Sequence, residues 1–410
     1  MAQIGLKGIK TIRDFAANDG LKGKTVFLRL DLNVPLKEGV ITDLTRITAS
    51  LPTIKFAMEN GAKLIIASHL GRPKSAADKK YSMAPVAEKI GELLDIEVIL
   101  MEEPNSDGVK HFLSGPMKKQ IICLENLRFD EGEIENKNEL AQVWASYSDV
   151  YINDAFGACH RAHASIHALP EIMQKKGIGF LIEKEVLMLE KLFNNPAKPY
   201  LAVLGGAKVS DKIPVIEKLM DVVDGFIIGG AMAYTFLKAK GINVGKSLVE
   251  TDKLKFAKEI MERIEGRGKT LLLPVDHVIS TGLTDLSNIK TTLSSTIPDN
   301  EMGLDIGPKT IQNYKTALLE AKTVFWNGPM GVFETKEFSK GTFAIAAALA
   351  ESSAFKIVGG GDSAAAAELS GYADKMSHIS TGGGASLEYI QGERLPGIEV
   401  LRPRKQSETI

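Results

Sequence analysis

The chain has 410 residues, of which 25% are charged and 44% are hydrophobic, and its formal net charge is only −1. This composition predicts a globular chain with two or three hydrophobic cores and argues against a disordered or fibrous protein. Because 50 basic residues are balanced by 51 acidic ones, no overall positive field would draw the chain to nucleic acid or to an anionic membrane. We therefore expect neither as a partner, and any bound anion must be held by local charges.

No segment of the sequence predicts export or membrane insertion. Residues 1–15 contain no apolar signal segment, and the longest uncharged stretch in the middle of the chain, residues 225–237, is too short to cross a bilayer. The two cysteines, Cys123 and Cys159, have no CxxC or Cys/His spacing around them. We expect a cytoplasmic protein with buried thiols and without a disulfide framework or a zinc site.

Short β-branched runs alternate with longer segments of helical periodicity, a pattern that predicts βαβ units and parallel sheets. In the first half the predicted strands are 25–30, 63–68, 97–100, 120–124 and 150–153, with helices such as 47–59 and 84–94 between them. In the second half the predicted strands are 200–204, 226–228, 270–273, 324–326 and 356–358, with helices such as 209–220 and 253–264. The sequence therefore predicts two successive Rossmann-like α/β domains, each with a parallel sheet flanked by helices.

Residues 180–193 have the periodicity of a helix, and we interpret this helix as the connection between the two domains. Ile182, Val186, Leu189 and Phe193 recur at helical spacing, and an Asn-Asn-Pro sequence ends the pattern. The spacing alone does not exclude the alternative of an ordinary packed helix inside one domain.

The predicted strands of the first half are followed by arginines. In open parallel sheets, ligands bind beyond the carboxyl ends of the strands, so these positions are informative. The chain has only 11 arginines among its 50 basic residues. The arginines in or just after the strand-end segments of the first half are Arg29, Arg46, Arg72, Arg128 and Arg161. Guanidinium groups bind phosphate and carboxylate with two parallel hydrogen bonds, so this set predicts a compact polyanionic metabolite, with His69, His160 and His163 as further donors.

The predicted strands of the second half are followed by glycines instead. The clusters are Gly205-Gly206, Gly229-Gly230, Gly328, Gly359-Gly360-Gly361 and Gly382-Gly383-Gly384. Without a Cβ atom the backbone can approach a phosphate closely and donate its N–H groups, which predicts nucleotide binding. Lys208 and Lys212 follow the first cluster four residues apart, and at the start of the predicted helix they would share one face and reach the phosphates.

Two partial motifs narrow the nucleotide chemistry. Residues 241–247 resemble a P-loop but have one residue too few between the glycines and do not follow a strand. Residues 359–364 satisfy the dinucleotide fingerprint G-x-G-x-x-A, but no acidic residue lies about twenty positions further on to hold a ribose. Asp362 instead suits Mg²⁺ that is shared with nucleotide phosphates.

Eight ordered motifs between residues 29 and 388 together resemble the phosphoglycerate kinase family over essentially the whole chain. They are RLDLNVP, SHLGRP, ENLRF, NDAFGACHRAH, LGGAKVSDK, FWNGPMGVFE, GGGDS and STGGGASLE. The resemblance implies reversible transfer of the 1-phosphoryl group of 1,3-bisphosphoglycerate to MgADP, giving 3-phosphoglycerate and MgATP, in glycolysis and gluconeogenesis. It also implies a monomer.

The resemblance further implies a role for each matching residue. The substrate residues of the first domain, residues 1–178, are Asp31, Asn33, Arg46, His69, Leu70, Gly71, Arg72, Arg128 and Arg161. The nucleotide residues of the second domain, residues 198–387, are Lys208, Lys212, Asn327, Glu334, Gly360, Gly361, Asp362 and Ser363. Arg46, Lys208 and Lys212 are the implied catalytic residues, and Asp362 is the implied Mg²⁺ ligand. Residues 179–197 are the implied interdomain helix, and residues 388–410 return to the first domain.

Phosphoryl transfer needs in-line positioning and cations around the transferred group more than covalent help from the protein. Because the two ligands are expected on separate domains, we predict closure about a hinge and direct transfer without a phosphoenzyme. Two alternatives remain at this point. A nicotinamide-dependent dehydrogenase would use the Gly359 fingerprint, and a nucleotide sensor without catalysis would keep the glycine loops but have no use for the arginines.

Overall fold

The computed structural model describes residues 5–18, 20–115 and 120–403. The described residues divide into two compact units, residues 5–187 with 394–403, and residues 188–393. We call these the first unit and the second unit. The sequence placed the functional domains at 1–178 with 388–410 and at 198–387, and residues 404–410 of that prediction lie outside the described residues. The roles of the two halves stay predictions.

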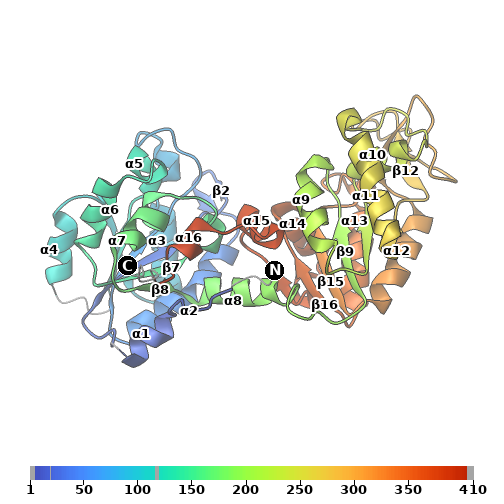
Figure 1. Cartoon of the computed structure of the whole chain (residues 1–410). Helices are drawn as coiled ribbons and strands as arrows, with labels where there is room; N and C mark the ends of the chain where they lie inside the picture. Colours follow the sequence, from blue (N-terminus) through green and yellow to red (C-terminus); the bar gives the residue numbers. More distant parts are fainter. Residues whose placement is uncertain (1–4, 19, 116–119, 404–410) are drawn as a thin grey trace. The chain divides into compact units, whose positions relative to one another are not determined.

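The first unit contains a six-stranded sheet with helices and turns between its strands (Figure 1). The strands of the unit are β1 (Thr25–Leu30), β2 (Leu36–Lys37), β3 (Val40–Ile41), β4 (Lys63–Ala67), β5 (Glu97–Met101), β6 (Gln120–Leu124), β7 (Val150–Asp154) and β8 (Lys176–Ile178), of which β2 and β3 form a separate two-stranded sheet. Its α-helices are α1 (Ile12–Asn18), α2 (Thr45–Glu59), α3 (Ala84–Leu94), α4 (Gly108–Ser114), α5 (Glu131–Ile134), α6 (Asn138–Ala145), α7 (Leu169–Ile172) and α16 (Pro396–Glu399). A 3-10 turn, η2 (Leu127–Phe129), and a π-helical turn, η4 (Ala164–Ala168), carry residues of interest.

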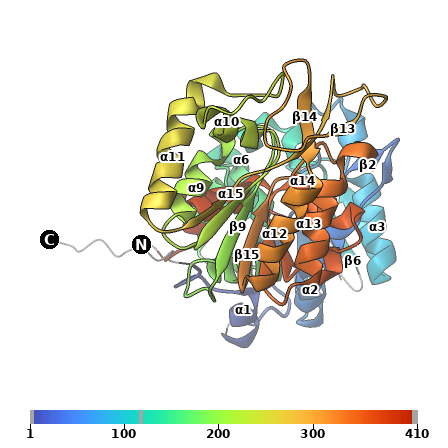
Figure 2. The ribbon, with the colours of Figure 1, turned by 90° about the vertical axis from the view of Figure 1, so that its right-hand side faces the viewer.

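The second unit repeats this architecture and adds a small antiparallel sheet. Its strands are β9 (Tyr200–Leu204), β10 (Gly225–Ile228), β11 (Thr270–Leu272), β12 (His277–Ser280), β13 (Lys290–Thr291), β14 (Met302–Ile306), β15 (Thr323–Asn327), β16 (Phe355–Val358) and β17 (His378–Ile379). Its α-helices are α9 (Ile213–Leu219), α10 (Met232–Ala239), α11 (Leu254–Gly266), α12 (Pro308–Glu320), α13 (Lys340–Glu351), α14 (Gly361–Leu369) and α15 (Gly384–Gln391). Figure 2 shows α9, α10 and α11 on one side of β9 and β15, with α12 and α13 on the other.

The two large sheets are parallel throughout, as the sequence predicted. The strand order is β5-β6-β4-β1-β7-β8 in the first and β11-β10-β9-β15-β16-β17 in the second. In both, the predicted strands occupy five neighbouring positions, and the sixth strand at the edge, β8 or β17, was not predicted. The predicted α/β fold is thus confirmed, whereas the small sheet β13-β12-β14 is an addition that the sequence did not indicate.

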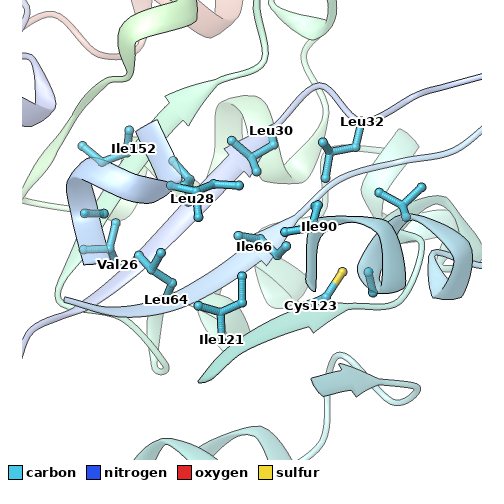
Figure 3. Packing of buried hydrophobic residues seen from close by; sticks show 14 of the residues in the cluster. Val26, Leu28, Leu30, Leu32, Leu64, Ile66, Ile90, Ile121, Cys123 and Ile152 are labelled. Carbon is cyan, nitrogen blue, oxygen red and sulfur yellow. The ribbon is translucent and has the colours of Figure 1, made fainter. Parts of the chain in front are cut away.

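The core of the first unit follows from the alternation of side chains along the strands. Val26, Leu28 and Leu30 of β1 face one side and belong to one cluster with buried residues of α2 and α3. Figure 3 shows these three side chains together with Ile90 of α3. Phe27 faces the other side, where its ring lies 5.9 Å from that of Trp144. Strands buried on both faces leave only their ends for ligands.

Helix α8 (Phe180–Glu190) begins at residue 180, as the sequence predicted. The division between the two units falls inside it, between Leu187 and Met188. Both cysteines are buried and free, which confirms the expectation of buried thiols. Among the described residues, none of the helices combines the length and the apolar composition that crossing a bilayer requires.

Candidate functional site

The predicted substrate residues of the first unit lie at one edge of its sheet. Strands β6, β4, β1 and β7 are parallel neighbours, so their carboxyl ends meet at the same edge. The predicted residues that follow these strands are Asp31 and Asn33 after β1, His69, Leu70, Gly71 and Arg72 after β4, Arg128 in η2 after β6, and Arg161 after β7. Arg46 is the second residue of α2.

Asp31 and Arg46 form an ion pair. Nη1 of Arg46 contacts Oδ1 of Asp31, and the side chain of Asp31 is only 2% exposed. The other carboxylate oxygen, Oδ2, is buried and has no hydrogen-bond partner among the described residues. A buried carboxylate oxygen without a donor is costly, so this atom is suited to accept a hydrogen bond from a ligand hydroxyl. The pair also orients the Arg46 guanidinium.

Gly71 joins three of the predicted residues through its backbone. Its N–H donates to Oδ1 of Asn33 at 2.7 Å, and its carbonyl accepts from Nη1 of Arg128 at 2.8 Å. The residue has a φ of +59°, and a Cβ atom would lie 2.3 Å from the Tyr81 ring. Only glycine fits this position without displacing the ring, and the loop therefore fixes Asn33 and Arg128 relative to each other.

Positive charge outweighs negative charge at this edge, where the nearby acids are Asp31 and Glu133. Burial, followed by the charges of Arg29 and Arg161, lowers the pKa of Arg128 to about 10, although the charge of Glu133 opposes the shift. Nε of Arg128 is buried and has no hydrogen-bond partner within the described residues. Burial, followed by the charges of Arg128, Arg29 and Arg161, lowers the pKa of His163 to about 4. The group is chemically suited to bind a multiply charged anion.

Arg29 is a further member of this group; the sequence placed it among the arginines expected to bind an anion, but the family resemblance gave it no individual role. It is fully buried, and its Nε donates to Oγ of Ser165 at 2.8 Å while Nη2 lies 3.1 Å from Nδ1 of His69. Ser165 in turn donates from N and Oγ to the buried carboxylate of Glu133, at 2.8 Å and 2.6 Å. One signal was available, because a charged residue within the apolar strand TVFLRL must have a specific partner.

In the second unit, the glycine loops after β9, β10 and β15 contact one another directly. The N–H of Gly206 donates to the carbonyl of Pro329 at 3.0 Å, and the N–H of Gly230 donates to that of Met330 at 2.9 Å. A Cβ atom on Gly205 would lie 2.1 Å from the carbonyl oxygen of Pro329, and one on Gly230 would lie 2.5 Å from N of Gly206. Side chains are therefore excluded here, and backbone groups line this edge of the sheet.

Lys212 and Asn327 are brought together, although they are 115 residues apart. Nζ of Lys212 donates to Oδ1 of Asn327, and Nδ2 of Asn327 donates to the carbonyl of Gly359 at 2.5 Å. Burial lowers the pKa of Lys212, while nearby Asp211 and Asp362 oppose that shift. The ammonium group of Lys212 is partly desolvated, and its neighbour Asn327 is held by the carbonyl of Gly359. The ammonium group is therefore suited to contact a phosphate.

Lys208 does not lie on a helix with Lys212, and this prediction was wrong. The predicted helix 209–220 is a 3-10 turn at Ser210–Lys212 followed by α9, which has Pro214 as its second residue. Proline is favoured in the first turn of a helix because it lacks the N–H, so α9 begins later than the hydrophobic pattern suggests. Lys208 is exposed in the loop after β9, and Glu334 is exposed in the segment between β15 and α13.

The predicted nucleotide loop, residues 360–363, begins helix α14. Gly360 has a φ of +91°, and a Cβ atom there would lie 2.6 Å from Nδ2 of Asn327. Gly361 and Asp362 form the first turn of α14, and Oγ of Ser363 accepts from the N–H of Gly328 at 2.6 Å. A helix amino terminus that follows a glycine turn favours anions, and Asp362 adds an exposed carboxylate suited to a cation.

His277, for which the sequence suggested no role, is buried in β12. Its Nε2 lies 3.2 Å from the carbonyl of Ser295, its ring is 5.4 Å from that of Tyr234, and burial lowers its pKa to about 4. These contacts assign it to the packing of the small sheet.

Comparison with known proteins decides the family. The family model described as phosphoglycerate kinase matches residues 13–393, which is most of the chain. The chain belongs to the phosphoglycerate kinase family. The predicted phosphoglycerate kinase activity, in glycolysis and gluconeogenesis, is confirmed by this match and by curated relatives.

Relatives named phosphoglycerate kinase match along their full length. The protein from Bdellovibrio bacteriovorus is 66% identical over 98% of this chain and 99% of its own. The protein from Anaeromyxobacter sp. (strain Fw109-5) is 52% identical over 93% of this chain and 97% of its own. The solved phosphoglycerate kinase of Coxiella burnetii has a TM-score of 0.85 at 40% identity, covering 96% of this chain and 98% of that one. That of Pyrococcus horikoshii has a TM-score of 0.81 at 34% identity, covering 95% and 98%.

Proposed function

We propose that the first unit binds 3-phosphoglycerate or 1,3-bisphosphoglycerate at the edge formed by β1, β4, β6 and β7. The observation that carries this assignment is the group of buried and half-buried cations around Arg128, whose pKa is lowered by burial and by the charges of Arg29 and Arg161. Such a group is stabilised when an anion binds. His69, Arg72, Arg128 and Arg161 would hold the 3-phosphate. Asp31 and Asn33 would hold the glycerate end, where Oδ2 of Asp31 has an unfilled capacity to accept a hydrogen bond.

We propose that the second unit binds ADP or ATP over its glycine loops. Lys208, Lys212 and Asn327 would contact the phosphates, Gly360, Gly361 and Ser363 would form the loop beneath them, and Glu334 would contact the ribose. The close packing of Gly205 and Gly230 against neighbouring backbone supports this, because it leaves N–H groups rather than side chains at the edge.

Asp362 is the residue that would hold Mg²⁺. Within the described ranges, no group of three or more His, Cys, Asp or Glu side chains could hold a metal ion. A single exposed carboxylate in the first turn of α14 fits Mg²⁺, which takes one or two carboxylates and completes its shell with water and phosphate oxygens. When bound, Mg²⁺ would neutralise charge on the nucleotide phosphates.

The chemistry of the transfer makes three side chains catalytic in this proposal. Arg46 would face the transferred group from the substrate side, oriented by its ion pair with Asp31, and Lys208 and Lys212 would face it from the nucleotide side. Their charges oppose the negative charge on the equatorial oxygens in the transition state. In-line transfer requires the two bound ligands to meet, so we propose that hinge closure precedes transfer and excludes water.

A coupled assay with MgATP and 3-phosphoglycerate tests the activity, and calorimetric titration of each ligand alone tests the separate sites. We expect 3-phosphoglycerate-dependent ADP formation, and binding of each ligand without the other. An absorbance change with NAD and a hydroxy acid would favour a dehydrogenase, and nucleotide binding without turnover would favour a sensor. Sedimentation of the ligand-free protein tests the proposal that it is a monomer.

A further inference from the structure

Arg29 is a buried cation that forms hydrogen bonds with no carboxylate among the described residues. Its side chain is fully buried at the end of β1. Nε donates to the Ser165 hydroxyl, Nη1 to the carbonyl of Leu30, and Nη2 lies 3.1 Å from Nδ1 of His69. A buried guanidinium is retained only where each of its N–H groups has a partner, so the contact with His69 is part of what satisfies this residue.

The contact between Arg29 and His69 has only one chemical direction. A guanidinium group can donate hydrogen bonds but cannot accept them. Nδ1 of His69 must therefore present its lone pair to Nη2 of Arg29, and the ring proton must lie on Nε2. The hydrogen bond at Nδ1 is the one found for this ring within the described part of the chain, so the N–H at Nε2 is left for a ligand.

The charges around His69 also oppose its protonation. The groups that face it are Arg29 of β1, Arg128 of η2, Arg46 of α2 and His163, which precedes η4. Burial and these groups together lower the pKa of His69 well below its usual value. The ring is therefore neutral at physiological pH, and it donates to an anion without becoming charged itself.

Glu133 and Ser165 hold Arg29 in place. The Ser165 hydroxyl donates to Oε1 of Glu133, so its lone pairs face Nε of Arg29. Both residues are fully buried, in α5 and η4, and the backbone N–H of Ser165 donates to the same carboxylate. Glu133 thus orients the Ser165 hydroxyl, the hydroxyl orients the guanidinium of Arg29, and the guanidinium orients the ring of His69.

We propose that Arg29 is a positioning residue that holds His69 as the neutral tautomer with its proton on Nε2, ready to donate to the anionic substrate. The identity of that anion as the phosphoglycerate rests on the function proposed above, whereas the tautomer does not. Arg29 thereby acts on substrate binding through His69.

The tautomer can be read directly by long-range ¹H–¹⁵N NMR of protein labelled at histidine nitrogen, with the His69 signal assigned by its loss in His69→Gln. We expect the protonated nitrogen to be Nε2 and the pattern to stay constant from about pH 7 to pH 8.5, because burial and the nearby arginines lower the pKa of His69 well below its usual value. A proton on Nδ1, or on both nitrogens, would overturn the proposal.

The role of Arg29 is tested with Arg29→Met, which keeps length but removes charge and donors. We expect the His69 ring to lose its single tautomer, and KM for 3-phosphoglycerate to rise about tenfold or more with a smaller change in kcat. The matched control is Arg13→Met, at an exposed position of the same unit, where neither quantity should change. If Arg29→Met fails to fold, Ser165→Ala keeps Arg29 but removes its contact at Nε, together with the hydrogen bond from the Ser165 hydroxyl to Glu133, and a partial shift of the same tautomer signal is expected. An unchanged signal in the folded variant would refute the role of Arg29.

Two substitutions of His69 separate this inference from the proposed substrate site. His69→Gln keeps an amide N–H near the position of Nε2, whereas His69→Asn places its amide near Nδ1, so we expect the larger rise of KM in His69→Asn. If both leave KM unchanged while NMR reports Nε2–H, the substrate assignment fails and the positioning by Arg29 stands. If His69→Asn raises KM but NMR reports Nδ1–H, the substrate site stands and the positioning by Arg29 is refuted.

Discussion

Asp154, at the carboxyl end of β7, accepts a hydrogen bond of 2.5 Å from the hydroxyl of Thr53 in α2. The same carboxylate accepts from the backbone N–H groups of Leu181 and Ile182, and the Thr53 hydroxyl accepts from that of Phe180. These contacts satisfy three of the first N–H groups of α8, which otherwise have no partner inside the helix. Two residues far apart in sequence thus fix the start of the helix in which the two units divide.

The pH dependence of stability should report Asp154. Burial raises its pKa to about 7, against an ordinary value of 3.8. Because the folded state binds this proton more tightly, the stabilisation is complete below about pH 4 and is lost as pH rises to 7, with an upper limit of about 4 kcal/mol. In Asp154→Asn, the amide oxygen can accept from both backbone N–H groups, and the amide NH₂ can donate to the Thr53 hydroxyl. We therefore expect a folded protein whose stability lacks the pH dependence caused by Asp154. Thermal unfolding of both proteins from pH 4 to pH 8 measures this pH dependence. If the melting temperatures of the two proteins changed with pH in parallel, the pH dependence could not be assigned to Asp154.

The same substitution at Asp305 should behave differently. Burial raises the pKa of Asp305 to about 7 as well, but its two oxygens accept from different N–H groups, those of Gly341 at 2.6 Å and Ile306 at 2.9 Å. An asparagine side chain at this position would offer only one oxygen, so Asp305→Asn should lower stability at every pH by about 1–3 kcal/mol. Melting temperatures of the two variants at pH 5 give the comparison. Equal losses would mean that the geometry of the donors does not matter.

The central strands could be predicted because buried strands consist of apolar runs, and in this sequence glycine and polar residues mark the ends of those runs. Strands β6 and β9 match the prediction residue for residue. The edge strands β8 and β17 could not be predicted, because three residues or fewer form strands only by pairing with β7 and β16. The small sheet could not be predicted for the same reason. Its strand β13 consists of two polar residues, Lys290 and Thr291, which form a strand only by pairing with β12.

The arrangement of the site was predictable where it follows from strand ends and not where it depends on contacts distant in the chain. The arginines and glycine clusters were identified because parallel strands end at one edge. The Arg29–Ser165 contact spans 136 residues, and no local pattern encodes it. The start of α9 was misplaced because the hydrophobic pattern continues through the 3-10 turn that Pro214 follows.

Arg46→Ala should lower kcat by about 10³-fold, with a smaller effect on nucleotide affinity, as for other cationic donors to a transferred phosphoryl group. The reason is that Arg46, oriented by Asp31, opposes charge that develops only in the transition state. Steady-state kinetics with both substrates varied measure this. Arg46→Lys is the control, because lysine keeps the positive charge but lacks the planar guanidinium group. We expect its kcat to lie between that of Arg46→Ala and that of the unchanged protein. A kcat equal to that of the unchanged protein would remove Arg46 from the mechanism.

Arg128→Ala should mainly raise KM for 3-phosphoglycerate, by about tenfold to a hundredfold, because the phosphate that it would hold does not react. Its hydrogen bond to the carbonyl of Gly71 would also be lost, so the loop after β4 should loosen. The measurement is KM for each substrate in the coupled assay, with Arg263→Ala, a half-exposed arginine of the second unit, as the control. If KM for MgATP rose instead, the assignment of Arg128 to the phosphoglycerate would be wrong.

Gly230→Ala should weaken nucleotide binding, whereas Gly241→Ala should not. Both glycines have positive φ, +65° and +80°, so alanine costs each about 1 kcal/mol of backbone strain. Only Gly230 is crowded, because its new Cβ atom would lie 2.5 Å from N of Gly206 and 2.8 Å from the carbonyl oxygen of Pro329, whereas nothing lies within 4 Å at Gly241. The clash must displace the loops proposed to hold the phosphates. We therefore expect a higher dissociation constant for ADP in Gly230→Ala by calorimetry, and a change in melting temperature alone in Gly241→Ala. Equal ADP affinity in the two variants would show that these loops do not contact the nucleotide.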